Sequence, residues 1–261
     1  MLEIRKGVSI VDPWPALCVE ELGLLVMADL HLGFEESLRK EGLFLPAGTS
    51  RRASDLAREA TIASGARRVV FLGDIKHEFG FPNPSEWVEV KALLHWFVRR
   101  GIGVEVVRGN HDNYIIAILR KFGIPLSERT VTHGGNTFTH GHLQLDESEI
   151  GSVLFLGHEH PSVALEDERG FVHRFKCFLH GRCGGREMFV LPSAMELATG
   201  TVVNRLERKE LLSPILRSCG VEDFKPYLLE PGKELRSFPS ISFLRATQTK
   251  SPVGLGTGSE S

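Results

Sequence analysis

The sequence predicts an α/β fold in which two β-sheets face each other and helices cover their outer faces. Up to about residue 130, short apolar runs typical of buried strands alternate with longer stretches that have apolar residues at helical spacing. From there onward, short β-like runs separated by glycine, proline and charged turns predominate. A βαβα first half followed by a mostly β second half indicates one layered domain, which we expect over residues 1–245.

The elements of the first half follow from local patterns. Each expected helix ends in a glycine that can act as its C-terminal cap, and two have a serine or threonine near their start. The expected elements are a hairpin of residues 16–20 and 24–28 turning at Leu22–Gly23, a helix from Thr49 or Ser50 to Gly65, a strand at 67–72, a helix over 84–101 capped by Ser85, a strand at 104–107 and a helix over 113–123.

The second half is expected to be built from strands. The apolar runs lie at residues 137–140, 152–156, 162–166, 170–179 and 187–193. Residues 226–238 then suggest a final hairpin with its turn near Pro231–Gly232. The last stretch, 246–261, is small, polar and rich in glycine, and we expect it to be a disordered tail.

Composition and length exclude several classes of protein. The 261 residues are 42% hydrophobic, which is enough to form a full core, and the formal net charge is −2. The overall electrostatic field therefore does not mark a nucleic-acid-binding protein. Four cysteines in a chain of this length do not form a disulfide framework, and no apolar run approaches the roughly 18 residues of a membrane span. We expect a cytoplasmic protein with no membrane segment.

Five strand-like runs each end in residues that can bind metals. These are, in chain order, Asp29 and His31; Asp74 and His77; Asn110, His111 and Asp112; His140 and His142; and His158 and His160. Glycine precedes the first polar residue in three of them, at Gly73, Gly109 and Gly157, where it lets the backbone come close to a ligand. Because ligands in open α/β sheets bind outside the carboxyl ends of strands, we expect these five ends to converge on one site.

This set of residues indicates metal chemistry. Imidazole nitrogens mixed with carboxylate and amide oxygens, without thiolates, suit Mn²⁺, Fe or Zn²⁺ better than Ca²⁺ or Mg²⁺. The ligands are too many for one ion but sufficient for two if one carboxylate bridges them. Two divalent ions outweigh the charges of Asp29, Asp74 and a bridging hydroxide, so the site would attract an anion. Such a pair can clamp both oxygens of an in-line displacement at phosphorus, with His158 and His160 serving one ion each.

The five stretches, in this order, resemble the calcineurin-like metallophosphoesterases. The resemblance extends from Asp29 to His160 and includes an Asp-x-His pair, a Gly-Asp pair, Gly-Asn-His-Asp, a lone histidine and Gly-His-x-His. It implies a four-layer αββα sandwich of two mixed sheets flanked by helices. It also implies two divalent metal ions as cofactors, for which we expect manganese, with iron and zinc as alternatives.

The resemblance further implies a role for each matching residue. His111 would contact the scissile phosphate without binding metal, and Asp112 would orient it. A metal-bound hydroxide would attack phosphorus directly, without a covalent enzyme intermediate. The implied metal ligands are Asp29, His31, Asp74 and His160 for the first ion, and the bridging Asp74 with Asn110, His140 and His158 for the second.

One position points to a subgroup. His77 stands three residues after Asp74, where many phosphatases of the family have an acidic residue or arginine. A histidine there is similar to the SbcD-like nucleases, their archaeal relatives and the DNA-ligase-associated PdeM-like group. The resemblance implies cleavage of a phosphodiester, in DNA or a nucleotide, with His77 in the catalytic site.

Other interpretations remain open at this point. The same metals would serve a phosphomonoesterase or a small-molecule phosphodiesterase, and the fold could also act as a non-catalytic scaffold for a protein partner. Whether the chain forms a homodimer is open too. His133 could replace His140 as the lone ligand, and His142 could support the site or lie in a loop. A structural zinc site could form from His173, Cys177, His180 and Cys183.

Overall fold

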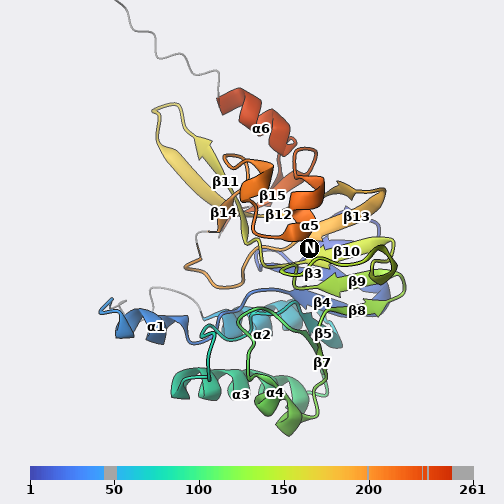
Figure 1. The fold of residues 1–261 in the computed structure, drawn as a ribbon, viewed down its shortest axis with the longest axis vertical. Helices are drawn as coiled ribbons and strands as arrows, with labels where there is room; N and C mark the ends of the chain where they lie inside the picture. The colour runs from blue at the N-terminus through green and yellow to red at the C-terminus, as the bar shows by residue number, and fades with distance from the viewer. Residues whose placement is uncertain (44–51, 199, 231, 234, 249–261) are drawn as a thin grey trace, which may run out of the picture.

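Two mixed β-sheets packed face to face form the centre of the molecule (Figure 1). The computed structural model describes residues 1–43, 52–198, 200–230, 232–233 and 235–248. Within these ranges, none of the helices combines the length and apolar character needed to cross a bilayer.

The first sheet has seven strands in sequence order. Its first four strands pair antiparallel and β4 to β7 pair parallel, as expected where helical crossovers connect the strands. The strands are β1 (Leu2–Arg5), β2 (Val8–Ile10), β3 (Ala16–Val19), β4 (Leu24–Met27), β5 (Arg68–Phe71), β6 (Gly103–Val107) and β7 (Leu126–Ser127). The β3–β4 hairpin confirms the one predicted around Leu22–Gly23.

The second sheet has a crossed strand order. Along it lie β14, β11, β12, β13, β10, β9 and β8, while β15 pairs with both β12 and β16. Its strands are β8 (Thr130–His133), β9 (Asn136–Thr139), β10 (Val153–Leu156), β11 (Pro161–Glu166), β12 (Val172–Cys183), β13 (Arg186–Val190), β14 (Thr201–Val202), β15 (Lys225–Leu229) and β16 (Arg236–Ser237). Strands β9, β10 and β13 form a parallel block at its centre, and β11 pairs parallel with β14 at one edge.

Helices cover both outer faces (Figure 1). Those over the first sheet are α2 (Ala53–Ser64), α3 (Pro84–Arg99) and α4 (Ile116–Leu119), with α1 (Phe34–Lys40) at one side; those over the second are α5 (Pro214–Cys219) and α6 (Ile241–Gln248). Single 3-10 turns occur at Glu20–Leu22, Arg120–Phe122, Glu147–Glu149 and Arg208–Glu210.

Strand periodicity explains why there are four layers. In β4, Leu25 and Met27 pack toward the helices while Leu24 and Val26 pack between the sheets. The same alternation in β10 divides its side chains between the inter-sheet core and the core under α5 and α6. Because successive side chains of a strand point to opposite faces, a strand that is apolar at every position must be covered on both sides. The predicted four-layer αββα sandwich is confirmed.

Several predicted element boundaries differ from the structure. Helix α3 is capped by Asn83 rather than Ser85, because the Asn83 side chain accepts from the Glu86 N–H in a capping box. Helix α2 begins after Arg52, and the expected caps Thr49 and Ser50 lie outside the described residues.

The C-terminal segment also differs in part. Strands β15 and β16 pair antiparallel within the segment expected to be a hairpin, although Pro231 at the expected turn lies outside the described residues. Residues 246–248, expected in the tail, belong to α6. The remainder of the expected tail, 249–261, also lies outside the described residues.

Candidate metal centre

Five strand ends bring the candidate residues together. The segments after β4 and β5 are joined by backbone hydrogen bonds from the Asp29 N–H to the Gly73 carbonyl (3.1 Å) and from the His31 N–H to the Asp74 carbonyl (2.9 Å). The segment after β10 joins the first sheet through its His158 N–H, which donates to Asp29 Oδ2 at 3.0 Å. The two sheets therefore meet at the carboxyl ends of their parallel strands, as the sequence predicts.

The side chains form two compact groups that could each hold a metal ion. One group is Asp29, His31 and His160, and the other is Asp74, His140 and His158; within each group one donor atom per residue lies within 4.8 Å of the others. In the first group, His160 Nε2 lies 3.2 Å from Asp29 Oδ1. Donor atoms bound to one ion at about 2.1 Å are roughly 3–4 Å apart, so both groups have a suitable size.

Asp74 belongs to the second group and also faces the first. Its Oδ2 is 3.4 Å from His140 Nε2 on one side and 3.8 Å from His31 Nε2 on the other. Asn110 joins the second group, since its Oδ1 lies 3.0 Å from His140 Nε2. The other ring nitrogen of His140 donates to the Leu72 carbonyl at 2.7 Å, which turns Nε2 toward the cluster.

Buried polar atoms in this cluster lack hydrogen-bond partners, as expected for atoms that would face a metal ion. Among the described residues, Asp29 Oδ1 and both ring nitrogens of His31 are buried without a hydrogen-bond partner. An unsatisfied buried polar group costs about 1–3 kcal/mol, so three in one place need an explanation. Bound cations would satisfy these atoms, and nitrogen and oxygen donors in this mixture suit a borderline transition metal.

The electrostatics of the cluster also favour added positive charge. Burial lowers the pKa of His31 to about 3 and, together with the nearby His140, that of His158 to about 4. For His140, burial acts in the same direction, but the Asp74 and Asp29 carboxylates outweigh it and raise its pKa to about 9. The two carboxylates thus favour positive charge beside His140, and a bound cation would supply that charge in place of the ring proton.

The backbone is strained at this site. Among the described non-glycine residues, six have positive φ, and five of them are candidate ligands at 45–63°: Asp29, His31, Asp74, His158 and His160. Such conformations cost on the order of 1–3 kcal/mol each and cluster at functional sites. Five such residues in one place indicate a functional site, where the geometry of the ligands is kept at a cost in stability.

Two of the predicted glycines provide the space for this arrangement. A Cβ on Gly109 would lie 2.1 Å from Asp74 Oδ1, and one on Gly157 would lie 2.7 Å from both Asp29 Oδ2 and the Ala28 Cβ. Any side chain at either position would displace a carboxylate of the cluster.

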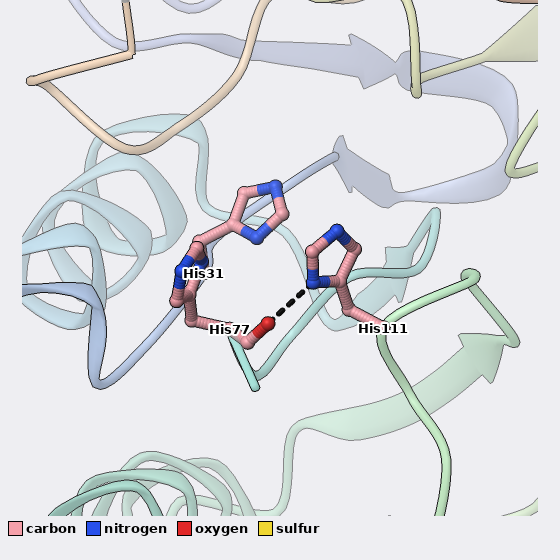
Figure 2. Close-up of side chains that lie close together, drawn as sticks. All are labelled: His31, His77 and His111. Atoms are coloured by element: carbon pink, nitrogen blue, oxygen red, sulfur yellow. Dashed lines mark hydrogen bonds between the residues drawn. The ribbon is translucent and has the colours of Figure 1, made fainter. Parts of the chain in front are cut away.

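His77 and His111 lie at the edge of the two groups. Figure 2 shows them beside His31, with the His77 carbonyl directed at the His111 ring. The three imidazoles also form a group with donor atoms within 4.8 Å. His111 Nδ1 is already paired with that carbonyl, while its Nε2 lies 3.9 Å from Asp74 Oδ2. His111 therefore presents its free nitrogen to the cluster.

The expected pairing of Asp112 with the His111 ring is wrong. The Asp112 carboxylate instead accepts from the backbone N–H groups of Asp74 (2.7 Å), Gly109 (2.9 Å) and Ile75 (3.0 Å). It is buried below these loops and fixes the backbone from which the cluster projects, so its influence on His111 is indirect.

Sequence reasoning missed two buried carboxylates that support the site. Glu86 accepts from the His77 N–H (3.0 Å), and Glu159, between the two histidines of the last stretch, accepts from the N–H groups of Leu212 (3.1 Å) and Ser213 (2.9 Å). The capping-box spacing from Asn83 to Glu86 was a usable signal. For Glu159 no local signal exists, because its partners are more than 50 positions away.

Local contacts bear on the three alternatives that concern individual histidines and the zinc candidate. His133 lies 2.9 Å from Glu105 and outside the cluster, so it does not replace His140. His142 lies beside the second group, 5.0 Å from the His140 ring between centroids, without joining it. The four residues considered for a zinc site form no metal-holding group among the described residues.

Three comparisons relate the chain to known proteins. The chain resembles solved structures that include the Pseudomonas putida nuclease MPE (TM-score 0.61, 17% identity, covering 85% of this chain and 92% of that one) and the E. coli phosphoesterase Yfce (TM-score 0.38, 22% identity, covering 66% and 79%). A search of curated proteins finds no match. The family model of the calcineurin-like phosphoesterases matches residues 22–177, more than half of the chain. The chain therefore belongs to the calcineurin-like phosphoesterase family.

Proposed function

We propose that this phosphoesterase is a dinuclear metal-dependent phosphodiesterase related to nucleases. Asp74 would bridge two divalent ions, for which manganese is the proposed metal and iron or zinc are alternatives. The other ligands would be Asp29, His31 and His160 for one ion and Asn110, His140 and His158 for the other. The location of Asp74 between two ligand groups, with unpartnered donor atoms around it, is the observation that supports this assignment.

The charge of the site fits a phosphate. Asp29 and Asp74 are the buried carboxylates in the two ligand groups, so two divalent ions would leave the cluster positive. When bound, the ions would polarise phosphoryl oxygens and lower the pKa of water. Substrate anions would therefore be attracted to the cluster and its water activated at neutral pH.

His111 would act on the phosphate itself. Since its Nδ1 pairs with the His77 carbonyl, its Nε2 is the nitrogen that faces the cluster. In the protonated ring this Nε2 would donate to a phosphoryl or leaving-group oxygen. His77 would hold His111 through its carbonyl, and Asp112 would hold both loops through their backbone, so the three proposed catalytic residues act as one unit.

Two features favour a diester, and one favours the alternative. His77 is the residue typical of the nuclease branch, and the protein with the similar fold from Pseudomonas putida is itself a nuclease. The net charge of −2 is the one observation that favours a small substrate, as in a phosphomonoesterase or nucleotide phosphodiesterase.

All four cysteines are free, which supports the proposed cytoplasmic location.

Hydrolysis of bis(p-nitrophenyl) phosphate with Mn²⁺ tests the proposal. The wild-type protein should hydrolyse this diester faster than p-nitrophenyl phosphate, and Asp74→Ala or His111→Ala should each lower kcat by about 100-fold or more. His173→Ala is the matched control, because this histidine is exposed and pairs with Asp167 away from the cluster. Wild-type rates in Asp74→Ala would overturn the metal assignment, and preferential monoester hydrolysis would select the alternative.

A further inference from the structure

Three exposed aromatic side chains lie next to the proposed site. Phe79 and Phe81, in the loop between β5 and α3, are 58% and 76% exposed, and Tyr114, after β6, is 49% exposed. The Phe81 ring stacks on the Tyr114 ring at 4.0 Å between centroids, and the Phe79 ring stacks on His111 at 3.7 Å. We call Phe79, Phe81 and Tyr114 the aromatic shelf. It starts at the imidazole proposed to contact the phosphate.

Buried charged groups hold the loop that carries the shelf. The Glu86 carboxylate accepts from the N–H groups of His77, Glu78 (2.6 Å) and Asn83 (2.8 Å). The Lys76 ammonium, also fully buried, donates to the carbonyls of Glu78 and Gly80 (3.0 Å). Burying charges costs several kcal/mol unless hydrogen bonds compensate. Because Glu86 and Lys76 make these hydrogen bonds to the loop backbone, they fix its conformation. Its outward phenylalanines are therefore not a consequence of disorder.

The second half of the shelf is also fixed. The Asn113 side-chain amide donates to the Phe79 carbonyl at 3.1 Å and joins the two segments. Tyr114 has φ of 67°, which is unusual for a bulky residue and persists only where the surrounding structure imposes it. The ring that meets Phe81 is thus held in place at a conformational cost.

We propose that the aromatic shelf stacks unpaired nucleobases of a single-stranded nucleic acid whose phosphodiester occupies the metal centre. This inference rests on the proposed function and specifies its substrate class. A phosphate group has no apolar surface and does not require exposed rings beside it, whereas a nucleobase presents a flat face that stacks on them. Bases inside a duplex already stack on one another, so a shelf open to solvent suits a strand whose bases are free. Stacking also tolerates any base, because every base presents a flat aromatic face.

The test compares two single strands of equal length, one of thymidine nucleotides and one of abasic nucleotides. Cleavage with Mn²⁺ would give kcat and KM, and fluorescence anisotropy in EDTA would give the affinity without turnover. Wild-type protein should have the lower KM and tighter binding for the thymidine strand. Phe81→Ala or Tyr114→Ala should raise that KM about 10-fold, toward the value for the abasic strand, with little change in kcat. Phe81→Trp should retain the preference.

Phe171→Ala is the matched control, since Phe171 is 64% exposed but lies in the turn between β11 and β12. It should keep the preference for the thymidine strand. Equal binding of both strands by the wild type, or a preference that survives in Phe81→Ala, would overturn the proposed stacking. A decrease in kcat alone would overturn it too, because it would mean that the rings only position His111. These outcomes leave the proposed function intact, whereas it fails separately if wild-type protein does not hydrolyse bis(p-nitrophenyl) phosphate.

Discussion

Two histidine-rich segments of the second sheet look alike in sequence and differ in structure. In residues 173–183, His173 and His180 each lie within 2.8 Å of a carboxylate from nearby in the chain, and the His180 ring also stacks on Phe189. In residues 157–160, the histidines instead face carboxylates of the other sheet.

This difference shows what makes a histidine available as a metal ligand. A histidine with its own local acceptor is already satisfied, whereas one on a strained turn at a sheet junction depends on groups from distant segments. The density of histidines is therefore a poor signal by itself. The number of strand ends that converge on the same point is the better one.

Replacing one histidine in each segment should give the largest contrast between them. His160→Ala should lower phosphodiester turnover by about 100-fold or more and reduce bound manganese from two ions toward one, because Asp29 and His31 lose their third partner. His180→Ala should change neither quantity. Metal content of the dialysed proteins, measured by elemental analysis beside the turnover assay, checks both. Full occupancy in His160→Ala would exclude this histidine as a ligand.

Metal removal should have the next largest effect. Ions that bind only the folded protein stabilise it by about 2.7 kcal/mol at a concentration 100 times their Kd. For a protein of this size, that corresponds to an increase in Tm of roughly 5–10 °C for each ion bound on adding Mn²⁺ to the metal-free protein. Calorimetric scans with and without Mn²⁺ measure it. The same shift is expected in His180→Ala, and its persistence in Asp74→Ala would place the stabilising ions elsewhere.

A smaller effect is expected from filling the space beside Asp29. In Gly157→Ala, the new methyl group would meet Asp29 Oδ2 and Ala28 at 2.7 Å, a clash that should cost about 1–3 kcal/mol in unfolding free energy. Gly80→Ala is the control, because a Cβ there meets nothing within 4 Å. Urea denaturation of the metal-free proteins compares them. Equal stability of the two variants would show that the junction of the sheets is not tightly packed.

The smallest effect should come from the support of residues 158–160. Glu159→Gln retains the shape of the side chain but leaves the N–H groups of Leu212 and Ser213 with a weaker, partly mismatched acceptor, at a cost of about 1 kcal/mol. The same denaturation experiment measures it, with Glu166→Gln on the exposed end of β11 as the control. Indistinguishable midpoints for the two variants would mean that Glu159 does not hold this turn.

Most of the fold and the members of the site were accessible from local patterns. Short apolar runs predicted the strands of two sheets, and the polar residues after five of them predicted one cluster. The error within the site concerns a group whose partners are distant. Asp112 was assigned to its neighbour His111, yet its carboxylate accepts the N–H groups of Asp74 and Ile75, 38 and 37 positions away.

The sequence by itself determined the layers and the chemical inventory, because hydrophobic periodicity and residue type are properties of short segments. Only the tertiary structure decided which histidines remain without a local acceptor, which ligands adopt strained backbone conformations and which aromatic rings stay in solvent beside the site. These properties depend on contacts such as that between Asp29 and His158, which are 129 positions apart. A contact of that range is specified by the packing of whole sheets, and no local pattern encodes it.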